Sequence, residues 1–500
     1  VDGSNLVNVL GNAEVTIDAA SEIVADGVGV AVFVGEESAA KDAKYTLNIY
    51  GKVTQKGKSY AISGNGSYPG TSYINIYEGA EVKANNIAEK KDCCAIYQPQ
   101  AGEINVYGGL VEGYCAIVMK SGTLNISGGT VRGIRNDNVL GDNNSAGNGA
   151  SYDGSAIVVD SRKTGYAGNV KINVTGGTVE SYYSTAIREI GNDSSMTQLV
   201  ELTVTGGEIL GASKNLTNAE NDILVRDISV SNVAISGGTF NHEVQADYCA
   251  VGYEPSEKDA SGMYTVQKVS GNAYYVDNNG KPVYGDLEKL LADSATNSKA
   301  IMLLDDVVTY GTDFLYLRAN KTIDLNGKTL VLPGKLFGFG KIIDSTDGTG
   351  LLKIGDMDGS QLPSNNGYLP VLDKAVEGYR LYSYTMKLFK TGYNVVGNGN
   401  TVKFAVQIEF ANLDAWNKIA ADDNSVELVF EAKWNTNVSI FRFEDTQLDK
   451  IAKDVTEEKR IGYFILTING FNNISGVEFR MTPQIKCKLF TQTIDTIIYK

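Results

Sequence analysis

Charged side chains recur just beyond a repeated Ala-Ile pair in the first half of the chain, and they are the residues best suited to acid–base chemistry. The set is Lys120, Asp160, Arg162, Arg188, Glu189, Arg226 and Asp227, close to a stretch that also holds Asp137, Asp142 and Asp153. Carboxylates beside basic groups can exchange protons with a substrate or hold Ca²⁺. If the chain is an enzyme, we expect Asp160, Arg188 and Glu189 to be its catalytic residues and calcium its cofactor. The alternative is a solvated loop edge with surface ion pairs.

A second candidate site consists of tyrosines, each two residues after an asparagine. Because side chains alternate between the two faces of a strand, both members of each pair should point outward together. Tyrosine rings next to amides can hold sugars by stacking and hydrogen bonding. The same pattern also suits stacked ladders that stabilise a sheet, so both interpretations stay open. The pairs are Asn48 and Tyr50, Asn75 and Tyr77, and Asn105 and Tyr107.

Composition excludes several classes of function. The chain has 500 residues, a formal net charge of −15 and no Lys/Arg-rich run, so nucleic acid is not an expected partner. The chain has no uninterrupted apolar stretch of about 18 residues, which is the length needed to span a bilayer. His242 is the only histidine, which removes histidine-based triads and multi-histidine metal sites, and we expect it to be exposed at the end of the repeats.

The elements that position these residues are repeats in the first half of the chain. The unit reads apolar, polar, apolar, any residue, Gly-Gly, any residue, apolar, any residue and a small residue. Clear copies start at Ile104, Leu124, Ile172, Leu202 and Val233, and looser ones at Val15, Leu47 and Ile74. We expect these starting residues, from Leu47 onward, to form one interior column.

The repeat length predicts a parallel β-helix. Ala95 and Ala116, which open two Ala-Ile pairs, are 21 residues apart, and Ile104 and Leu124 are 20 apart. About 20 residues suit one coil of two or three short strands, with glycine at a corner that needs positive φ. A leucine-rich horseshoe would need a leucine ladder, which these coils lack.

Charges of alternating sign occupy the outward position of the strand that follows the glycines. Neighbouring strands lie about 4.8 Å apart, so opposite charges there should compensate each other across the coils. The row is Lys83, Glu112, Arg132, Glu180, Leu210 and Asn241.

The end of the repeats resembles β-helical surface proteins of gut bacteria, which have the pectate-lyase-like fold. GGTF is followed by a tyrosine, a Gly-Tyr pair and Tyr-x-Val, matched by Phe240, Tyr248, Gly252, Tyr253, Tyr264 and Val266. The later DLNGKTL segment resembles the opening of a further β-helix in such proteins. The resemblance implies a right-handed parallel β-helix and implies little about activity.

Three domains are expected. Residues 1–252 should form the β-helix, and residues 253–350 a mixed helix–strand segment with a short helix around Leu287. Residues 351–500 have longer alternating strands, which favour an antiparallel β-sandwich interrupted by a helix near 414–421.

These observations favour a non-catalytic, exported protein of the cell surface or extracellular space. It would be adhesin-like and bind a glycan or another host or cell-surface macromolecule, without a cofactor. The alternative is a polysaccharide lyase or glycoside hydrolase, which the pectate-lyase-like resemblance requires us to consider. The start of the chain at Val1, without methionine, suggests that an export signal was removed.

Overall fold

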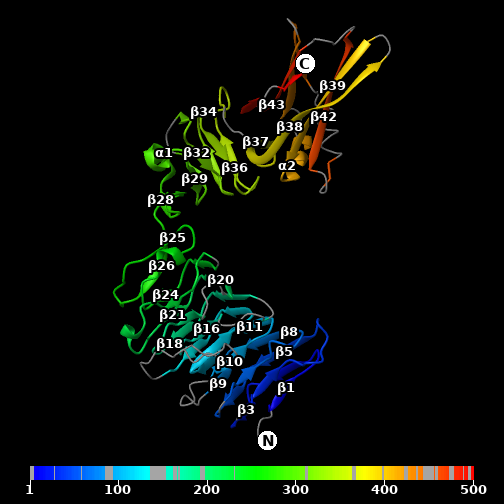
Figure 1. The fold of residues 1–500 in the computed structure, drawn as a ribbon. Coiled ribbons are helices and arrows are strands. Elements are labelled where there is room, and N and C mark those ends of the chain that lie inside the picture. Colours follow the sequence, from blue (N-terminus) through cyan, green and yellow to red (C-terminus); the bar gives the residue numbers. More distant parts are fainter. Residues whose placement is uncertain are drawn as a thin grey trace. The chain divides into compact units, whose positions relative to one another are not determined.

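The computed structural model describes most of the chain as strands joined by short loops (Figure 1). It forms two compact units, Val1–Val269 and Ser270–Lys500, and each is treated by itself below. The all-β class expected from the sequence is confirmed. The described residues are 5–27, 29–57, 59–84, 94–135, 154–161, 166, 169–191, 198–229, 231–309, 313–362, 367–396, 399–421, 426–434, 437–442, 455–456, 460–471, 478–487, 489–493 and 497–499.

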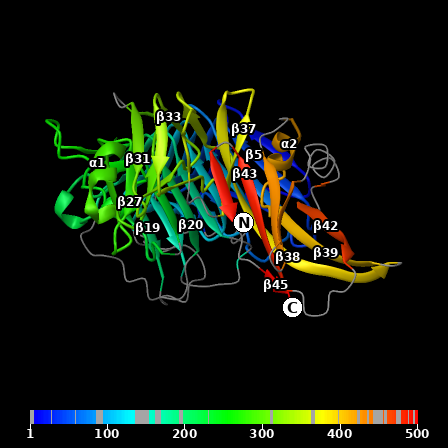
Figure 2. The ribbon, with the colours of Figure 1, turned by 90° about the horizontal axis from the view of Figure 1, so that it is seen from above.

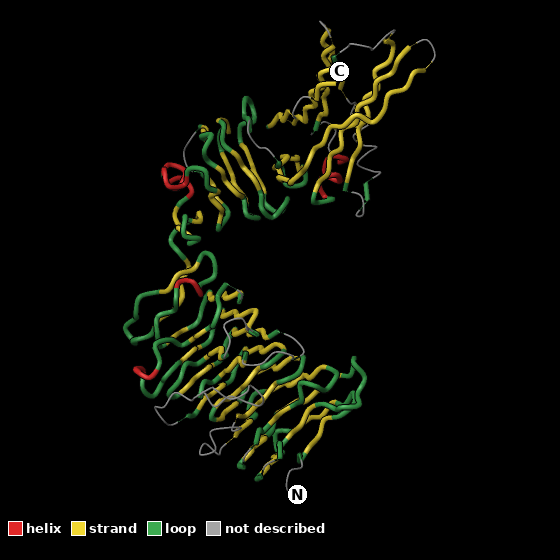
Figure 3. The backbone as a smooth tube through the Cα atoms, viewed as in Figure 1, coloured by secondary structure: helices red, strands yellow, loops and turns green. Residues whose placement is uncertain are grey.

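Three sheets of parallel strands make up most of the first unit, and the chain visits them in turn (Figure 3). Sheet A holds β1 (Val7–Val9), β4 (Val32–Val34), β7 (Ile62–Ser63), β10 (Cys94–Gln98), β13 (Cys115–Met119), β16 (Ile157–Asp160), β19 (Ile187–Ile190) and β22 (Ile223–Leu224). Sheet B holds β2 (Glu14–Ile17), β5 (Lys44–Ile49), β8 (Thr71–Ile76), β11 (Gly102–Val106), β14 (Gly122–Ile126), β17 (Val170–Val174), β20 (Leu199–Val204) and β23 (Asn232–Ile235).

Sheet C contains the strands that follow the glycine corners. Its parallel strands are β3 (Glu22–Ala25), β6 (Lys52–Gln55), β9 (Glu81–Ala84), β12 (Leu110–Gly113), β15 (Thr130–Gly133), β18 (Thr178–Ser181), β21 (Glu208–Leu210) and β24 (Thr239–Phe240). Each strand pairs with the strand three places further along the chain, so each turn of the chain adds one strand to every sheet.

Alternation along the strands builds the core of this unit. In β14, Leu124 and Ile126 are buried in the core, whereas Asn125 between them is partly exposed. The expected interior column is confirmed, because its members are in register on consecutive strands of sheet B: Leu47, Ile74, Ile104, Leu124, Ile172, Leu202 and Val233.

The glycine pairs form the corners between sheets B and C. The second glycine of each pair has positive φ, for example +71° at Gly109 and +70° at Gly129. A Cβ atom on Gly109 would also lie 2.5 Å from the carbonyl oxygen of Ala80 in the preceding coil. Conformation and space therefore both require glycine at this corner.

The first unit ends in a different arrangement. β26 (Tyr264–Lys268) pairs antiparallel with β24 and with β25 (Tyr253–Pro255). Two short 3₁₀ segments, η1 (Leu216–Asn218) and η2 (Ala246–Tyr248), lie in the loops of these last coils. Phe240, Tyr248 and Val266 are buried here and belong to the same core as the sheets.

The second unit begins with shorter strands, several of them parallel. A mixed sheet contains β27 (Ala273–Val276), β28 (Pro282–Gly285), β29 (Ala300–Leu303), β32 (Thr322–Asp324) and β35 (Lys341–Ile343). The expected helix near Leu287 is α1 (Leu287–Ala292), followed by η3 (Ser294–Thr296). Parallel pairs also join β30 (Val307–Val308), β33 (Thr329–Leu332) and β36 (Leu351–Ile354), and separately β31 (Phe314–Leu317) and β34 (Lys335–Gly338).

Antiparallel sheets form the rest of this unit. One contains β37 (Tyr368–Asp373), β38 (Gly378–Val396), β39 (Gly399–Phe410) and β42 (Ile461–Phe471); β39 lies between β38 and β42 (Figure 2). The other contains β40 (Glu427–Trp434), β41 (Asn437–Arg442), β43 (Phe479–Cys487), β44 (Phe490–Thr493) and β45 (Ile497–Tyr499). Both contribute buried residues to one core, with α2 (Asp414–Ala421) as the expected helix.

Hydrogen bonding continues across position 350 in the second unit, because β36 pairs with both β33 and β38. The division at 252 and 350 stays a prediction. In the described part of the chain, neither α1 nor α2 has the length and apolar character needed to cross a bilayer.

Candidate functional site

Three tyrosines form a stack on the outward side of sheet B. Tyr50, Tyr77 and Tyr107 directly follow residues that are in register on β5, β8 and β11. The centroids of Tyr50 and Tyr77 lie 4.3 Å apart with the rings 5° from parallel, and those of Tyr77 and Tyr107 lie 5.3 Å apart at 26°. Tyr50 is 38% exposed and Tyr107 51%. The three rings thus make one exposed aromatic strip, here called the tyrosine strip.

Both faces of the middle ring are occupied by its neighbours. Burial raises the pKa of Tyr77, and the adjacent phenols of Tyr50 and Tyr107 raise it further, so this ring stays uncharged at neutral pH. The free ring faces are those at the two ends of the stack. By register, Ser127 follows Tyr107 in the next coil, and Asp18 precedes Tyr50; both side chains are exposed and smaller than tyrosine.

The asparagines beside the strip form a continuous chain of hydrogen bonds. Asn75 Nδ2 donates to Asn48 Oδ1 at 2.9 Å, and Asn105 Nδ2 donates to Asn75 Oδ1 at 3.0 Å. The chain begins at Glu14, which accepts from Asn48, and continues through Asn125 and Asn173 to Thr203. We call this row the asparagine ladder.

The ladder leaves little amide surface for a ligand. Asn48 is 9% exposed and Asn105 is 8% exposed, and each amide already exchanges hydrogen bonds with the coils before and after it. Of the two interpretations of the asparagine row, these contacts favour sheet stabilisation. The tyrosine strip is the part of the predicted ligand-binding set that faces solvent.

The residues expected to act in catalysis do not converge on one point. Arg188 and Glu189 are consecutive in β19, so their side chains lie on opposite faces of sheet A. Asp160 is in register with Ile190 and therefore shares a face with Arg188. A substrate on either face of the sheet would meet only part of this trio.

Glu189 is buried on the inner side of sheet A and supports the backbone. Its Oε1 accepts from Ser161 Oγ at 2.6 Å and from the backbone N–H of Gln198 at 3.1 Å. Its Oε2 accepts from the N–H of Arg226 at 3.2 Å. A carboxylate with these contacts anchors the connections between coils.

Asp160 forms an ion pair with Lys120, whose Nζ lies 3.0 Å from Asp160 Oδ2. The expected solvated loop edge is wrong for these two residues, because both side chains are 0% exposed. They lie on the outer face of sheet A, which is itself covered: Val118 and Val158 are 0% exposed. The ring of Tyr166 lies 5.0 Å from Lys120 Nζ and forms part of this cover.

Calcium is the cofactor expected at the charged residues beyond the Ala-Ile pairs. Asp137, Asp142, Asp153 and Arg162 lie outside the described residues. Among the described residues, no group of three or more Asp, Glu, His or Cys side chains is arranged to hold a metal ion.

The expected charge row on sheet C is confirmed. Lys83, Glu112, Arg132, Glu180 and Leu210 are in register on successive strands, and Asn241 follows β24. Arg132 lies 3.2 Å from Glu112 and 2.8 Å from Glu180. Arg132 therefore pairs with the charges before and after it in the row, as expected of a structural row, whereas Lys83 pairs with Glu81 on its own strand.

A cavity that no sequence pattern indicated lies beside the last coils. It has a volume of about 580 Å³ and is lined by η1 and the residues after it, by the segment 241–246, and by Pro255, Lys258 and Tyr264. His242 lines it too, and the expectation that this residue is exposed is wrong, because its side chain is 15% exposed and bonded to Asp222. No sequence signal pairs His242 with Asp222, which lies 20 residues earlier on the preceding coil.

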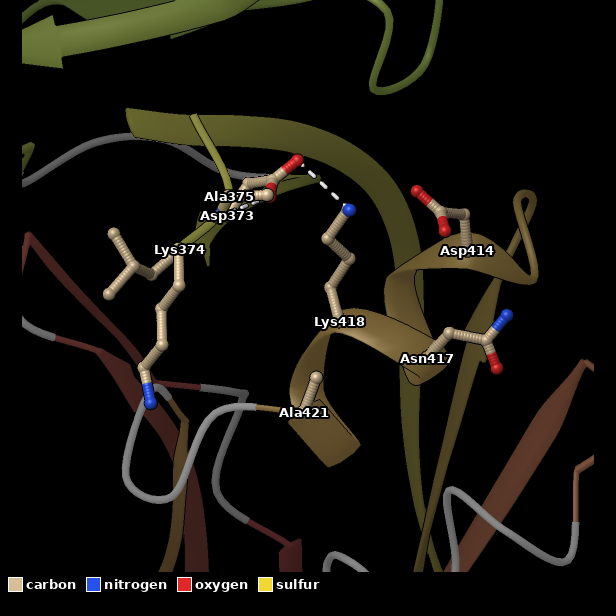
Figure 4. Close-up of a pocket in the computed structure, with 8 residues that line it drawn as sticks. Asp373, Lys374, Ala375, Asp414, Asn417, Lys418 and Ala421 are labelled. Atoms are coloured by element: carbon tan, nitrogen blue, oxygen red, sulfur yellow. Dashed lines mark hydrogen bonds and ion pairs between the residues drawn. The ribbon is translucent and has the colours of Figure 1, made fainter. Parts of the chain in front are cut away.

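A smaller pocket of about 210 Å³ lies in the second unit between α2 and the end of β37 (Figure 4). Lys418 Nζ lies 2.9 Å from Asp373 Oδ2, and Arg380 Nε lies 2.8 Å from the same oxygen. Burial raises the pKa of Asp373, but the hydrogen bonds from Arg380 and Lys418 outweigh burial and leave this pKa below its usual range. Lys374 points away from Lys418 (Figure 4). Asp373 thus joins Arg380 and Lys418 through one carboxylate oxygen, which indicates a structural network.

Comparison with known proteins finds no relative of this chain. The chain matches no protein-family model, no curated protein and no solved structure.

Proposed function

We propose that the protein is a non-catalytic, secreted or cell-surface protein that binds carbohydrate through the tyrosine strip. The observation that carries the proposal is an exposed stack of three rings on a flat sheet face, with an open ring face at Tyr107. Such a protein would act as an adhesin-like contact to a glycan or another macromolecule of a host or cell surface.

The chemistry of the strip suits weak binding. A pyranose ring laid on Tyr107 would cover apolar C–H groups against the ring face, while the Ser127 hydroxyl in the next coil offers a hydrogen bond. An aromatic contact of this kind contributes about 0.5–1.5 kcal/mol beyond the burial of area. Affinity should therefore be modest, because the free ring face at Tyr107 takes one sugar ring.

We further propose that the first unit is a right-handed parallel β-helix that serves as a rigid scaffold for the strip. The repeated order of sheets A, B and C and the parallel register support this, and parallel crossover connections are almost always right-handed. Eight strands per sheet at about 4.8 Å would give a stack of roughly 35–40 Å. For the last part of the chain, the shared core of the two antiparallel sheets supports a β-sandwich.

The geometry gives less support to a polysaccharide lyase or glycoside hydrolase. Two carboxyl groups about 5–10 Å apart and facing one sugar are needed by glycosidases. Glu189 faces the core and Asp160 is locked to Lys120 on the other face of the sheet, so the pair cannot face one sugar.

A glycan array probed with labelled protein, run beside an assay for unsaturated uronates on pectin with Ca²⁺, tests the proposal. We expect retention on a subset of glycans and no rise in uronate absorbance. Loss of retention in Tyr107→Ala, with retention unchanged in Tyr463→Ala, would assign binding to the strip; Tyr463 is a suitable control because it is 52% exposed and lies in the second unit. Product formation, or an array without any retained glycan, would contradict the proposal.

A further inference from the structure

His242 lies just after β24, where the loop of the preceding coil passes over it. Its ring makes two polar contacts: Nδ1 is 2.8 Å from Asp222 Oδ1, and Nε2 is 3.1 Å from the carbonyl oxygen of Leu216. The loop is therefore bonded at two places to a single imidazole, once through a carboxylate and once through a backbone carbonyl.

These contacts define the charge of the ring. A backbone carbonyl can only accept, so Nε2 must carry a proton to bond with Leu216. Asp222 is 4% exposed, and its two oxygens also accept from the N–H groups of Gly211 at 2.6 Å and His242 at 2.7 Å, so both oxygens already act as acceptors. Nδ1 must then donate as well, and an imidazole with two N–H donors is the imidazolium form.

The loop held by this ring forms one wall of the 580 Å³ cavity. Leu216, Thr217 and Glu220 line the cavity from the loop. Backbone bonds fix the start of the loop, from Ser213 to Ser181 and from Lys214 to Tyr182, and Gln245 Nε2 donates to Asn221 at its end. Within this segment the N–H of Asn215 is also bonded to the carbonyl oxygen of Ala212 at 2.8 Å, and the bond from His242 is the contact at Leu216.

We propose that the protonated ring of His242 holds residues 215–220 against the last coil, a contact here called the clasp. Loss of the proton releases this segment and opens the cavity. A neutral ring keeps its one proton on the side of the charged acceptor, Asp222, because charge-assisted bonds are the stronger ones. Nε2 then presents a lone pair to the Leu216 carbonyl oxygen, and the contact becomes repulsive.

The charged groups around the ring set the pH of release. The hydrogen bond from His242 to Asp222 raises the pKa of the imidazole above its usual value, whereas partial burial and the nearby Lys258 ammonium lower it by less. Glu220 and Glu243 also line the cavity. Because the folded pKa is raised, the clasp contributes fully below the ordinary histidine pKa, and its contribution is lost as the pH rises through the folded pKa.

The single histidine makes the test direct. The ring nitrogens of ¹⁵N-histidine-labelled protein give one set of NMR signals, and we expect both nitrogens to be protonated at pH 6, with a titration midpoint above about 6.5. Amide hydrogen exchange of residues 215–220 is then compared between wild type and His242→Gln at each pH, which removes the intrinsic pH dependence of exchange. We expect wild type to exchange more slowly than His242→Gln at low pH. The ratio of the two exchange rates should approach one above the midpoint.

A second variant keeps the test independent of how His242→Gln folds. Lys258→Met removes a positive charge near the ring without touching the clasp, so the NMR midpoint and the exchange transition should both move to higher pH. Three results would each overturn the proposal. They are a ring with one proton at pH 6, a ratio of wild-type to His242→Gln exchange rates that is flat across the titration, and an unmoved midpoint in Lys258→Met.

Discussion

Side chains of one kind recur at one position of successive coils in sheet B, and their contacts run along the stack. Each asparagine of the ladder gives one hydrogen bond to the preceding coil and receives one from the next. Because these amides are nearly buried, breaking the ladder at one rung leaves unsatisfied groups on both sides.

Replacement of Asn105 by alanine should therefore destabilise the first unit by about 1–3 kcal/mol, since it removes the partner of Asn75 Oδ1 and of Asn125 Nδ2. Urea denaturation followed by circular dichroism measures the change. Ser127→Ala is the matched control, because Ser127 is exposed on the next coil and outside the ladder. If Asn105→Ala is as stable as this control, the ladder contributes little.

The ion pairs of sheet C link neighbouring strands as elements. Glu81 on β9 lies 2.8 Å from Lys52 on β6, and it also pairs with Lys83 on its own strand. The hydrogen bonds from Lys52 and Lys83 lower the pKa of Glu81 to about 2, despite a small opposing effect of burial.

We expect this part of the sheet to lose stability in acid. A carboxylate with a lowered folded pKa stabilises the fold above its unfolded pKa of about 4.3, and the contribution disappears as the pH falls toward 2. The stability difference between wild type and Glu81→Gln should thus shrink from pH 6 to pH 2, and the Glu81 carboxyl carbon should titrate well below 4.3 in NMR. A midpoint at or above 4.3 would show that the pair is too exposed to matter.

The direction of each side chain, into the core or outward, was predictable where only one face of a strand is buried. Leu124, Asn125 and Ile126 alternate as expected, and the column through sheet B follows from that alternation. The middle strands of sheet A are buried on both faces, so Val158 on the outer face and Val159 on the inner face are equally apolar, and the sequence there does not indicate which residue points inward. That is why the inward direction of Glu189 was not apparent from the sequence.

Contacts between coils were predictable only where the repeat fixes the register. The tyrosine strip and the charge row follow from equal spacing, whereas the pairing of His242 with Asp222 depends on a loop of irregular length between β21 and β22. In the second unit, β39 pairs with β42 across about fifty residues, and no local pattern specifies such a partner.

At the scale of the whole molecule, each buried cluster of the sheets belongs to one unit. The core of the first unit ends at Val266, and that of the second begins at Ala273. Residues 1–269 expressed alone should therefore fold, with a Tm and near-UV circular dichroism that reproduce the corresponding transition of the full chain. A fragment without a cooperative transition would contradict the division into two units.

Calorimetric titration tests whether the tyrosine strip binds carbohydrate. One oligosaccharide series selected from the array is titrated into wild type, Tyr107→Ala and Tyr463→Ala. We expect modest affinity in wild type and in Tyr463→Ala. In Tyr107→Ala, affinity should fall about 2- to 10-fold, the equivalent of one aromatic contact, with circular dichroism unchanged. Equal affinity of all three proteins would contradict the claim and leave the strip as a structural stack.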